Sequence, residues 1–268
     1  MSKTNSEMSF LEHLEELRWH IIRALASALI FTVIAFIFKG ILFDCIILGP
    51  TSPDFFTNKS LCWLAVKLDM PTLCINKEPL ILQNINMAGQ FSMHIWISFI
   101  TGIIIAFPYI FWEFWRFIKP ALYPNEIKNS RGAIFFASIL FLIGVLFAYY
   151  LICPLTIQFF GNYKVSENVG NIINLNSYIS TISSIIVACG IMFELPMLIY
   201  FLTKIGIISS SFLKKYRKHA VIVILSVSAI ITPPDVLSMI LVWMPIMLLY
   251  EGSILIAKRV EKLKKITN

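Results

Sequence analysis

Long runs of apolar residues, separated by short charged segments, dominate this chain. No charged side chain occurs from Pro79 to Trp112, and none from Gly132 to Tyr163. Each run exceeds the ~20 apolar residues that a membrane-spanning helix needs. Backbone groups in lipid must satisfy their own hydrogen bonds, and the runs lack the alternation of a membrane barrel, so helices are predicted. The pattern predicts six spans, at about 20–43, 86–111, 131–153, 177–203, 218–231 and 236–256.

The composition agrees with an all-α integral membrane protein. Hydrophobic residues make up 58% of the chain and charged residues only 14%, whereas a soluble protein carries about a quarter charged residues. No polar segment is long enough to fold separately, so residues 1–268 are predicted to form a single membrane domain. The lipid bilayer is thus the first expected partner.

The distribution of positive charge predicts the orientation. With the N-terminus inside, 17 of the 22 Lys and Arg residues fall in inner segments, and the outer segments hold only Lys39, Lys59, Lys67, Lys77 and Lys164. Inner loops of membrane proteins collect positive charge, so both termini are expected on the inner side. The same bias explains the net charge of +7, and no nucleic-acid partner is expected.

The last two predicted spans are short. His219–Pro234 and Val236–Tyr250 each hold about 15 uncharged residues, or ~22 Å of helix against a hydrocarbon core of ~30 Å. Such a hairpin must thin the bilayer, sink into it or pack against partners. In the turn Thr232-Pro-Pro-Asp235, the prolines end one helix and Asp235 can cap the next.

The first outer loop, about 44–83, is too long for a simple connector and is expected to form a cap. It contains Cys62 and Cys74, which could form a disulfide in an oxidising compartment or could be small buried apolar residues. No spacing of His and Cys residues resembles a metal site, and no cofactor is predicted.

Four ionisable residues fall inside or at the ends of apolar runs. Glu194, followed by Pro196, lies in the inner half of the fourth span, where a carboxylate is costly and is more often functional than structural; the proline indicates a kink. Glu113 lies at the inner end of the second span, where it is either a functional group or an anchor at the membrane interface. His94 is interpreted as a hydrogen-bonding residue between helices, and Glu251 as a residue that reaches the interface.

Two inner segments carry candidate binding residues. Phe10–Arg18 has an apolar stripe and places Glu12 and Glu16 on another face of a helix, either as a solvated face paired with Arg18 or as a site for a cationic partner. Phe117–Glu126 reads as a rigid turn with two prolines that presents a carboxylate at the membrane surface, and this is a plausible receptor surface.

The sequence also bears on two other classes of function, an enzyme and a secondary transporter. The chain lacks His-Glu-x-x-His, Gly-x-Ser-x-Gly and a glycine loop for phosphate, so an intramembrane enzyme or a nucleotide hydrolase is not expected. A secondary transporter that uses Glu194 as a proton relay is the alternative, although inverted repeats and broken half-helices are not evident.

Four separated motifs resemble the TatC family, the receptor subunit of the twin-arginine protein translocase. His13–Arg18 is similar to H-L-x-E-L-R, and Phe117–Glu126 is similar to F-I-x-P-A-L-Y-x-x-E. Further along, Phe193–Pro196 matches F-E-x-P and Thr232–Asp235 matches T-P-P-D. The resemblance covers about residues 9–257, and the first outer loop departs from it by its length and its two cysteines.

The resemblance implies a glove-shaped bundle with a concave face in a bacterial cytoplasmic membrane. It implies a protein that is no enzyme, binds twin-arginine signal peptides, associates with itself and with TatA- and TatB-type single-span subunits, and transports folded proteins by the proton-motive force. The residues implied for signal-peptide binding are Glu16, Arg18, Phe117, Tyr123 and Glu126. The resemblance further implies polar partner contacts at Glu113 and Glu194, and matches Pro50 and Asp235.

Overall fold

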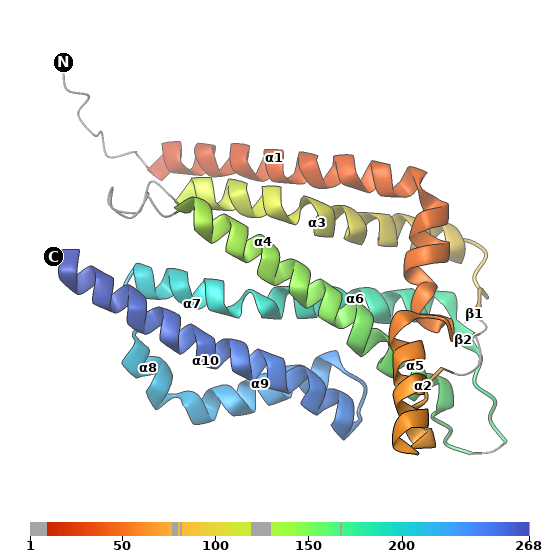
Figure 1. The fold of residues 1–268 in the computed structure, drawn as a ribbon. Coiled ribbons are helices and arrows are strands. Elements are labelled where there is room, and N and C mark those ends of the chain that lie inside the picture. Colours follow the sequence, from red (N-terminus) through yellow and green to blue (C-terminus); the bar gives the residue numbers. More distant parts are fainter. Residues whose placement is uncertain (1–9, 77–79, 81, 119–129, 167, 268) are drawn as a thin grey trace.

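The structure is a computed structural model that describes residues 10–76, 80, 82–118, 130–166 and 168–267. It is an assembly of helices with one pair of two-residue parallel strands (Figure 1). The helices that build the inner and central parts are α1 (Phe10–Ile37), α3 (Gly89–Ile118), α4 (Ser130–Phe147), α6 (Leu175–Phe193), α7 (Leu195–Lys204), α8 (Ser210–Lys215), α9 (Arg217–Ile231) and α10 (Val236–Thr267). The remaining elements gather at the outer end: η1 (Ile41–Ile47), η2 (Gly49–Thr51), α2 (Phe56–Leu68), η3 (Pro71–Leu73), β1 (Leu82–Gln83), η6 (Ala148–Ile152), α5 (Cys153–Asn162) and β2 (Ile173–Asn174).

The helical membrane fold is confirmed, and the fifth of the six predicted spans is shorter than the others. Five described segments are long and apolar enough to cross a membrane, namely Leu14–Ile37, Gly89–Ile118, Ile134–Asn162, Leu175–Lys204 and Ser238–Leu263. The predicted fifth span is α9, whose 15 residues make only ~22 Å of helix. The sequence prediction that this span is short is therefore confirmed.

The predicted sixth span, at 236–256, is wrong in its length, because the helix that contains it is much longer. α10 continues for 32 residues to Thr267, well beyond the predicted end at 256. The charged residues after Tyr250 end the apolar run, but Glu, Lys, Ala and Leu are strong helix formers and do not end a helix. Only the outward-running arm of the last hairpin is short.

The first and last described helices begin and end at one end of the bundle. Figure 1 shows the start of α1 and the end of α10 on the same side, and the η1, α2 and β1–β2 elements on the opposite side. An even number of passes is required for this arrangement, so α9 acts as the outward pass that pairs with α10. The start of α1 and the end of α10 therefore share a side, as predicted, and the charge bias identifies it as the inner side.

Glycines allow the closest helix contacts. A Cβ atom added at Gly102 of α3 would meet the backbone of α1 at Thr32, at 2.6 Å, and at Ala28, at 2.9 Å. At Gly144 of α4, an added Cβ would lie 2.7 Å from the Cys189 carbonyl oxygen of α6. Small residues of this kind let membrane helices approach closely and gain van der Waals contact.

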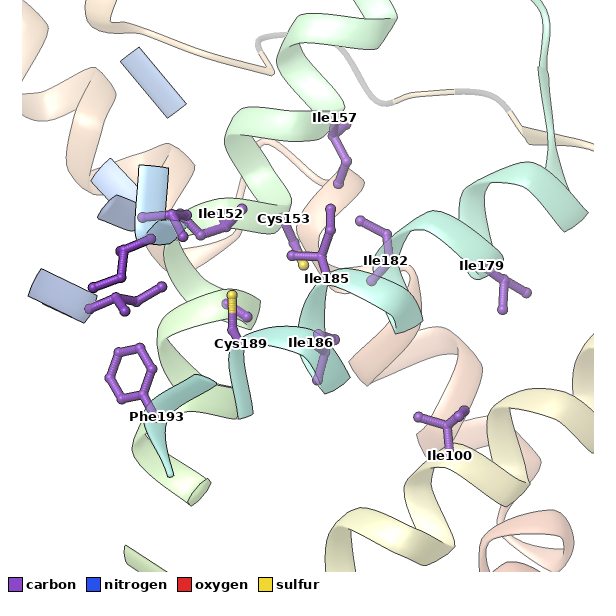
Figure 2. Close-up of a cluster of buried hydrophobic side chains, with 14 of the residues drawn as sticks. Ile100, Ile152, Cys153, Ile157, Ile179, Ile182, Ile185, Ile186, Cys189 and Phe193 are labelled. Carbon is purple, nitrogen blue, oxygen red and sulfur yellow. The ribbon is translucent and has the colours of Figure 1, made fainter. Parts of the chain in front are cut away.

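A large part of the buried core lies where α6 packs against α4 and η6. Figure 2 shows Ile182, Ile185 and Cys189 of α6 near Ile152 at the end of η6 and Cys153 at the start of α5. Ile152, Cys153 and Cys189 are completely buried. β-Branched side chains with restricted rotamers fill this space, and α6 supplies the largest share of the fully buried isoleucines.

The first outer loop forms the predicted cap, and Cys62 and Cys74 form a disulfide within it. The completely buried Asn58 donates from Nδ2 to the carbonyl oxygens of Pro50 and Ser52, at 3.2 and 2.8 Å. Asn76 donates to the Asn58 Oδ1 atom at 3.2 Å and to the carbonyl oxygen at the base of α5 at 3.1 Å. The cap is thus tied to α5 by a buried polar network.

Candidate functional site

The inner ends of α1 and α3 bring together the described part of the predicted receptor surface. Glu16 and Arg18 lie on α1, and Phe117 lies in the last turn of α3 rather than in a turn between helices. Glu16 is partly buried, and its Oε2 atom makes no hydrogen bond within the described residues, while Arg18 is exposed. The predicted Tyr123 and Glu126 lie outside the described residues.

A buried ion cluster joins α1 to α3 beside these residues. The Glu113 carboxylate is 1% exposed, and its Oε2 atom lies 2.5 Å from Nδ1 of His20. Two guanidinium groups flank it, with Arg23 Nη1 3.8 Å from Oε2 and Arg116 Nη1 3.7 Å from Oε1. Glu113 was predicted as a polar site, but its contacts with His20, Arg23 and Arg116 were not. Nothing in the sequence signals the pairing, because His20 and Glu113 are 93 residues apart.

The cluster shares a face with the receptor surface. Glu16, His20 and Arg23 are spaced four and three residues apart, so they lie along one side of α1. The His20 ring meets the Phe117 ring edge-on, with 6.2 Å between ring centres. One side of α1 therefore carries both the Glu16 carboxylate, whose Oε2 atom accepts no hydrogen bond from the described residues, and the histidine that holds Glu113.

Glu194 occupies the junction between α6 and α7. α6 ends at Phe193 and α7 begins at Leu195, which confirms the break predicted from Pro196. Both carboxylate oxygens of Glu194 are buried; the backbone of Phe141 in α4 faces the carboxyl group, but no described group completes a hydrogen bond of ordinary geometry with it. A buried carboxyl group in this state is costly.

The long α10 holds the inner loop between α7 and α9. Its Glu261 accepts from the backbone N–H and the hydroxyl of Ser210, at 2.7 and 2.5 Å. Glu251, which directly follows Tyr250, pairs with Arg217 at 2.8 Å, so its predicted interfacial position includes an ion pair. These contacts fix α8 and the start of α9 against α10.

The remaining predicted positions have structural contacts. Pro50 is buried in η2, and its carbonyl oxygen accepts from Asn58. The Asp235 carboxylate accepts from the backbone N–H of Ser238 at 2.8 Å, which confirms it as the cap of α10. The His94 Nε2 atom lies 3.1 Å from the Phe36 carbonyl oxygen, which confirms the predicted bond between helices. The described residues form no group of three or more potential metal ligands.

The fold and its polar sites define an all-helical, multi-pass membrane protein with a receptor-like inner surface. Residues 12–245 match the family model described as Sec-independent protein translocase protein (TatC). The chain therefore belongs to the TatC family, which makes it a subunit of a protein transport system and not an enzyme. Bacterial members of this family reside in the cytoplasmic membrane.

Individual relatives agree along nearly the whole length. The chain is 44% identical to the Sec-independent protein translocase protein TatC of Blattabacterium, over 98% of this chain and all of that protein. It is 33% identical to the TatCy protein of Bacillus subtilis, over 94% of this chain and 90% of that protein. The crystal structure of the twin-arginine translocase receptor TatC in DDM superposes with a TM-score of 0.71, at 32% identity, and covers 92% of this chain and 99% of that one.

Proposed function

We propose that this chain is the signal-peptide receptor of a twin-arginine translocase. It binds signal peptides with two consecutive arginines at the inner ends of α1 and α3, through Glu16, Arg18, Phe117, Tyr123 and Glu126. It then acts with TatA- and TatB-type single-span subunits and with further copies of itself to pass folded proteins across the membrane, driven by the proton-motive force. No cofactor takes part.

The observation that carries the proposal is the state of Glu16. Its partly buried carboxylate has an acceptor oxygen without a hydrogen bond in the described residues, at the membrane end where a precursor arrives. A guanidinium fork binds carboxylate with two parallel hydrogen bonds, a geometry that lysine does not reproduce. Charge-assisted bonds of this kind contribute about 1.5–3 kcal/mol each, enough for two arginines to set specificity.

Photo-crosslinking of a twin-arginine peptide to the inserted protein tests the site. Glu16→Ala and Glu126→Ala should each abolish the crosslink while the protein still inserts. Glu126→Gln should also fail, because it keeps the shape but loses the charge. Glu15→Ala is the matched control, since Glu15 is an exposed carboxylate next to Glu16 on α1. Normal crosslinking in the Glu16 and Glu126 variants would refute the assignment.

Glu194 and Glu113 are assigned to the contacts with partner subunits in this proposal. The buried carboxylate of Glu194, which lacks a hydrogen bond of ordinary geometry within the described residues, supports a partner helix that donates a hydrogen bond there. A secondary transporter would instead use Glu194 as a proton relay, which requires a series of hydrogen-bonded groups. Glu194 begins no such series within the described residues, and export of a twin-arginine reporter in cells that lack their own receptor separates the two functions.

A further inference from the structure

The cluster around Glu113 raises an electrostatic problem for the receptor surface. Arg23 and Arg116 are both 47% exposed, and both lie within 4 Å of a carboxylate that is 1% exposed. A signal peptide that brings two arginines to this end of the bundle would meet these two positive charges of the protein. Like charges at partly exposed sites repel each other unless a counter-charge lies nearby.

Glu113 has the position of that counter-charge. It lies between the two guanidinium groups, with one oxygen nearer to each of them. The bond from His20 fixes the Oε2 atom, and the Tyr109 side chain also interacts with this carboxylate. Its buried negative charge therefore acts on both arginines without occupying the surface itself.

The geometry also connects this carboxylate to the receptor surface. His20 lies one helical turn from Glu16 on the same side of α1, and its ring touches that of Phe117. The charge of Glu113 and its arginines therefore lies within a few ångströms of the side chains proposed to contact the peptide. Screening over such a distance is weak at low salt, because the Debye length is about 10 Å at 0.1 M.

We propose that Glu113 is a positioning residue for signal-peptide recognition, whose buried carboxylate holds the protein's own Arg23 and Arg116 and lowers their net positive charge beside the peptide site. The inference rests on the proposed receptor function. It assigns Glu113 a role toward the signal peptide in addition to any contact with partner subunits. His20 takes part by fixing the carboxylate between α1 and α3.

The test is the affinity of the purified, full-length protein for a synthetic twin-arginine peptide, measured by fluorescence anisotropy. Glu113→Gln keeps the shape and an acceptor for His20 but removes the charge. Binding should weaken roughly tenfold at low salt, as expected for one uncompensated charge about 10 Å away. The deficit should shrink several-fold at about 0.5 M salt, because screening removes the repulsion. Glu251→Gln, which breaks the exposed pair with Arg217 on α10, is the matched control and should bind as the wild type does.

Removal of the two arginines separates an electrostatic role from a merely structural one. Glu113→Gln combined with Arg23→Gln and Arg116→Gln should regain wild-type affinity. A deficit that persists in the triple variant, or that does not change with salt, would overturn the inference. Arg23→Gln with Arg116→Gln in the presence of Glu113 gives an independent test if Glu113→Gln does not fold, and a loss of binding there would overturn it too. Failure of the wild-type protein itself to bind the peptide would instead refute the proposed receptor function.

Discussion

Replacement of Glu194 by leucine should stabilise the isolated protein and impair its function. Both oxygens of this carboxyl group are buried and make no hydrogen bond of ordinary geometry within the described residues. A buried polar group in this state costs about 1–3 kcal/mol, and leucine has a similar volume without polar atoms. The free energy of unfolding of Glu194→Leu should therefore rise by about that amount.

The measurement is reversible unfolding of the purified protein in mixed micelles, followed by helicity. Glu251→Leu provides the comparison, because its carboxylate is already paired with Arg217 at 2.8 Å and both side chains are partly exposed. Exposed pairs of this kind contribute about 0–1 kcal/mol, so that variant should be neutral or slightly less stable. The two substitutions make the same chemical change in opposite states of hydrogen bonding.

A functional assay completes the experiment. If a partner helix supplies the missing donor, Glu194→Leu should reduce cysteine crosslinking between α6–α7 and single-span subunits, and export of a twin-arginine reporter should fall. Peptide binding at the inner surface should stay intact. A loss of stability above about 1 kcal/mol would show that the carboxylate makes a structural hydrogen bond, and unchanged crosslinking with normal export would exclude the partner contact.

Three further predictions concern the fold. Replacing both Cys62 and Cys74 by serine opens a loop with a sequence separation of 12 and should destabilise the cap by about 3 kcal/mol, measured as faster proteolysis of α2 with an unchanged inner surface. Gly102→Ala should destabilise the α1–α3 contact by about 1–3 kcal/mol in the same unfolding assay, whereas Gly252→Ala, where an added Cβ meets nothing within 4 Å, should not. Insertion of five leucines or alanines into α9 would lengthen this helix from ~22 Å to about 30 Å. If thinning of the bilayer by the short helix assists transport, export of the reporter should fall while membrane insertion and partner assembly persist. Full export by the lengthened protein would exclude a role for bilayer thinning.

The insertion experiment tests the short length of α9, the outward-running helix of the last hairpin. α9 has 15 residues, and exposed lysines and arginines of α8, α9 and α10 surround its inner end. These charges are costly to move into the hydrocarbon core, so the mismatch must be absorbed toward the outer surface. Because Glu261 and Glu251 bind the inner loop to α10, the arm cannot slide independently of its neighbour.

The sequence by itself determined the class of protein, its orientation and the local breaks in its helices. Apolar length and the distribution of Lys and Arg are properties of contiguous segments, so the spans and their direction follow without knowledge of their neighbours. The break at Pro196 and the cap at Asp235 are equally local, since each depends on backbone groups within four residues. The inner motifs further indicated the family and most of the residues proposed to bind the peptide.

Only the tertiary structure decided which polar groups meet. His20 and Glu113 are 93 residues apart, and Asn76 reaches the base of α5 across 78 residues. The role of Glu261 was likewise missed, because it depends on Ser210, 51 residues earlier in the chain. Apolar burial is nondirectional and can be read from composition, but an ion pair or hydrogen bond needs two groups within about 3–4 Å. That distance depends on how helices cross, which is fixed by close contacts such as the one at Gly102 and not by any pattern along the chain.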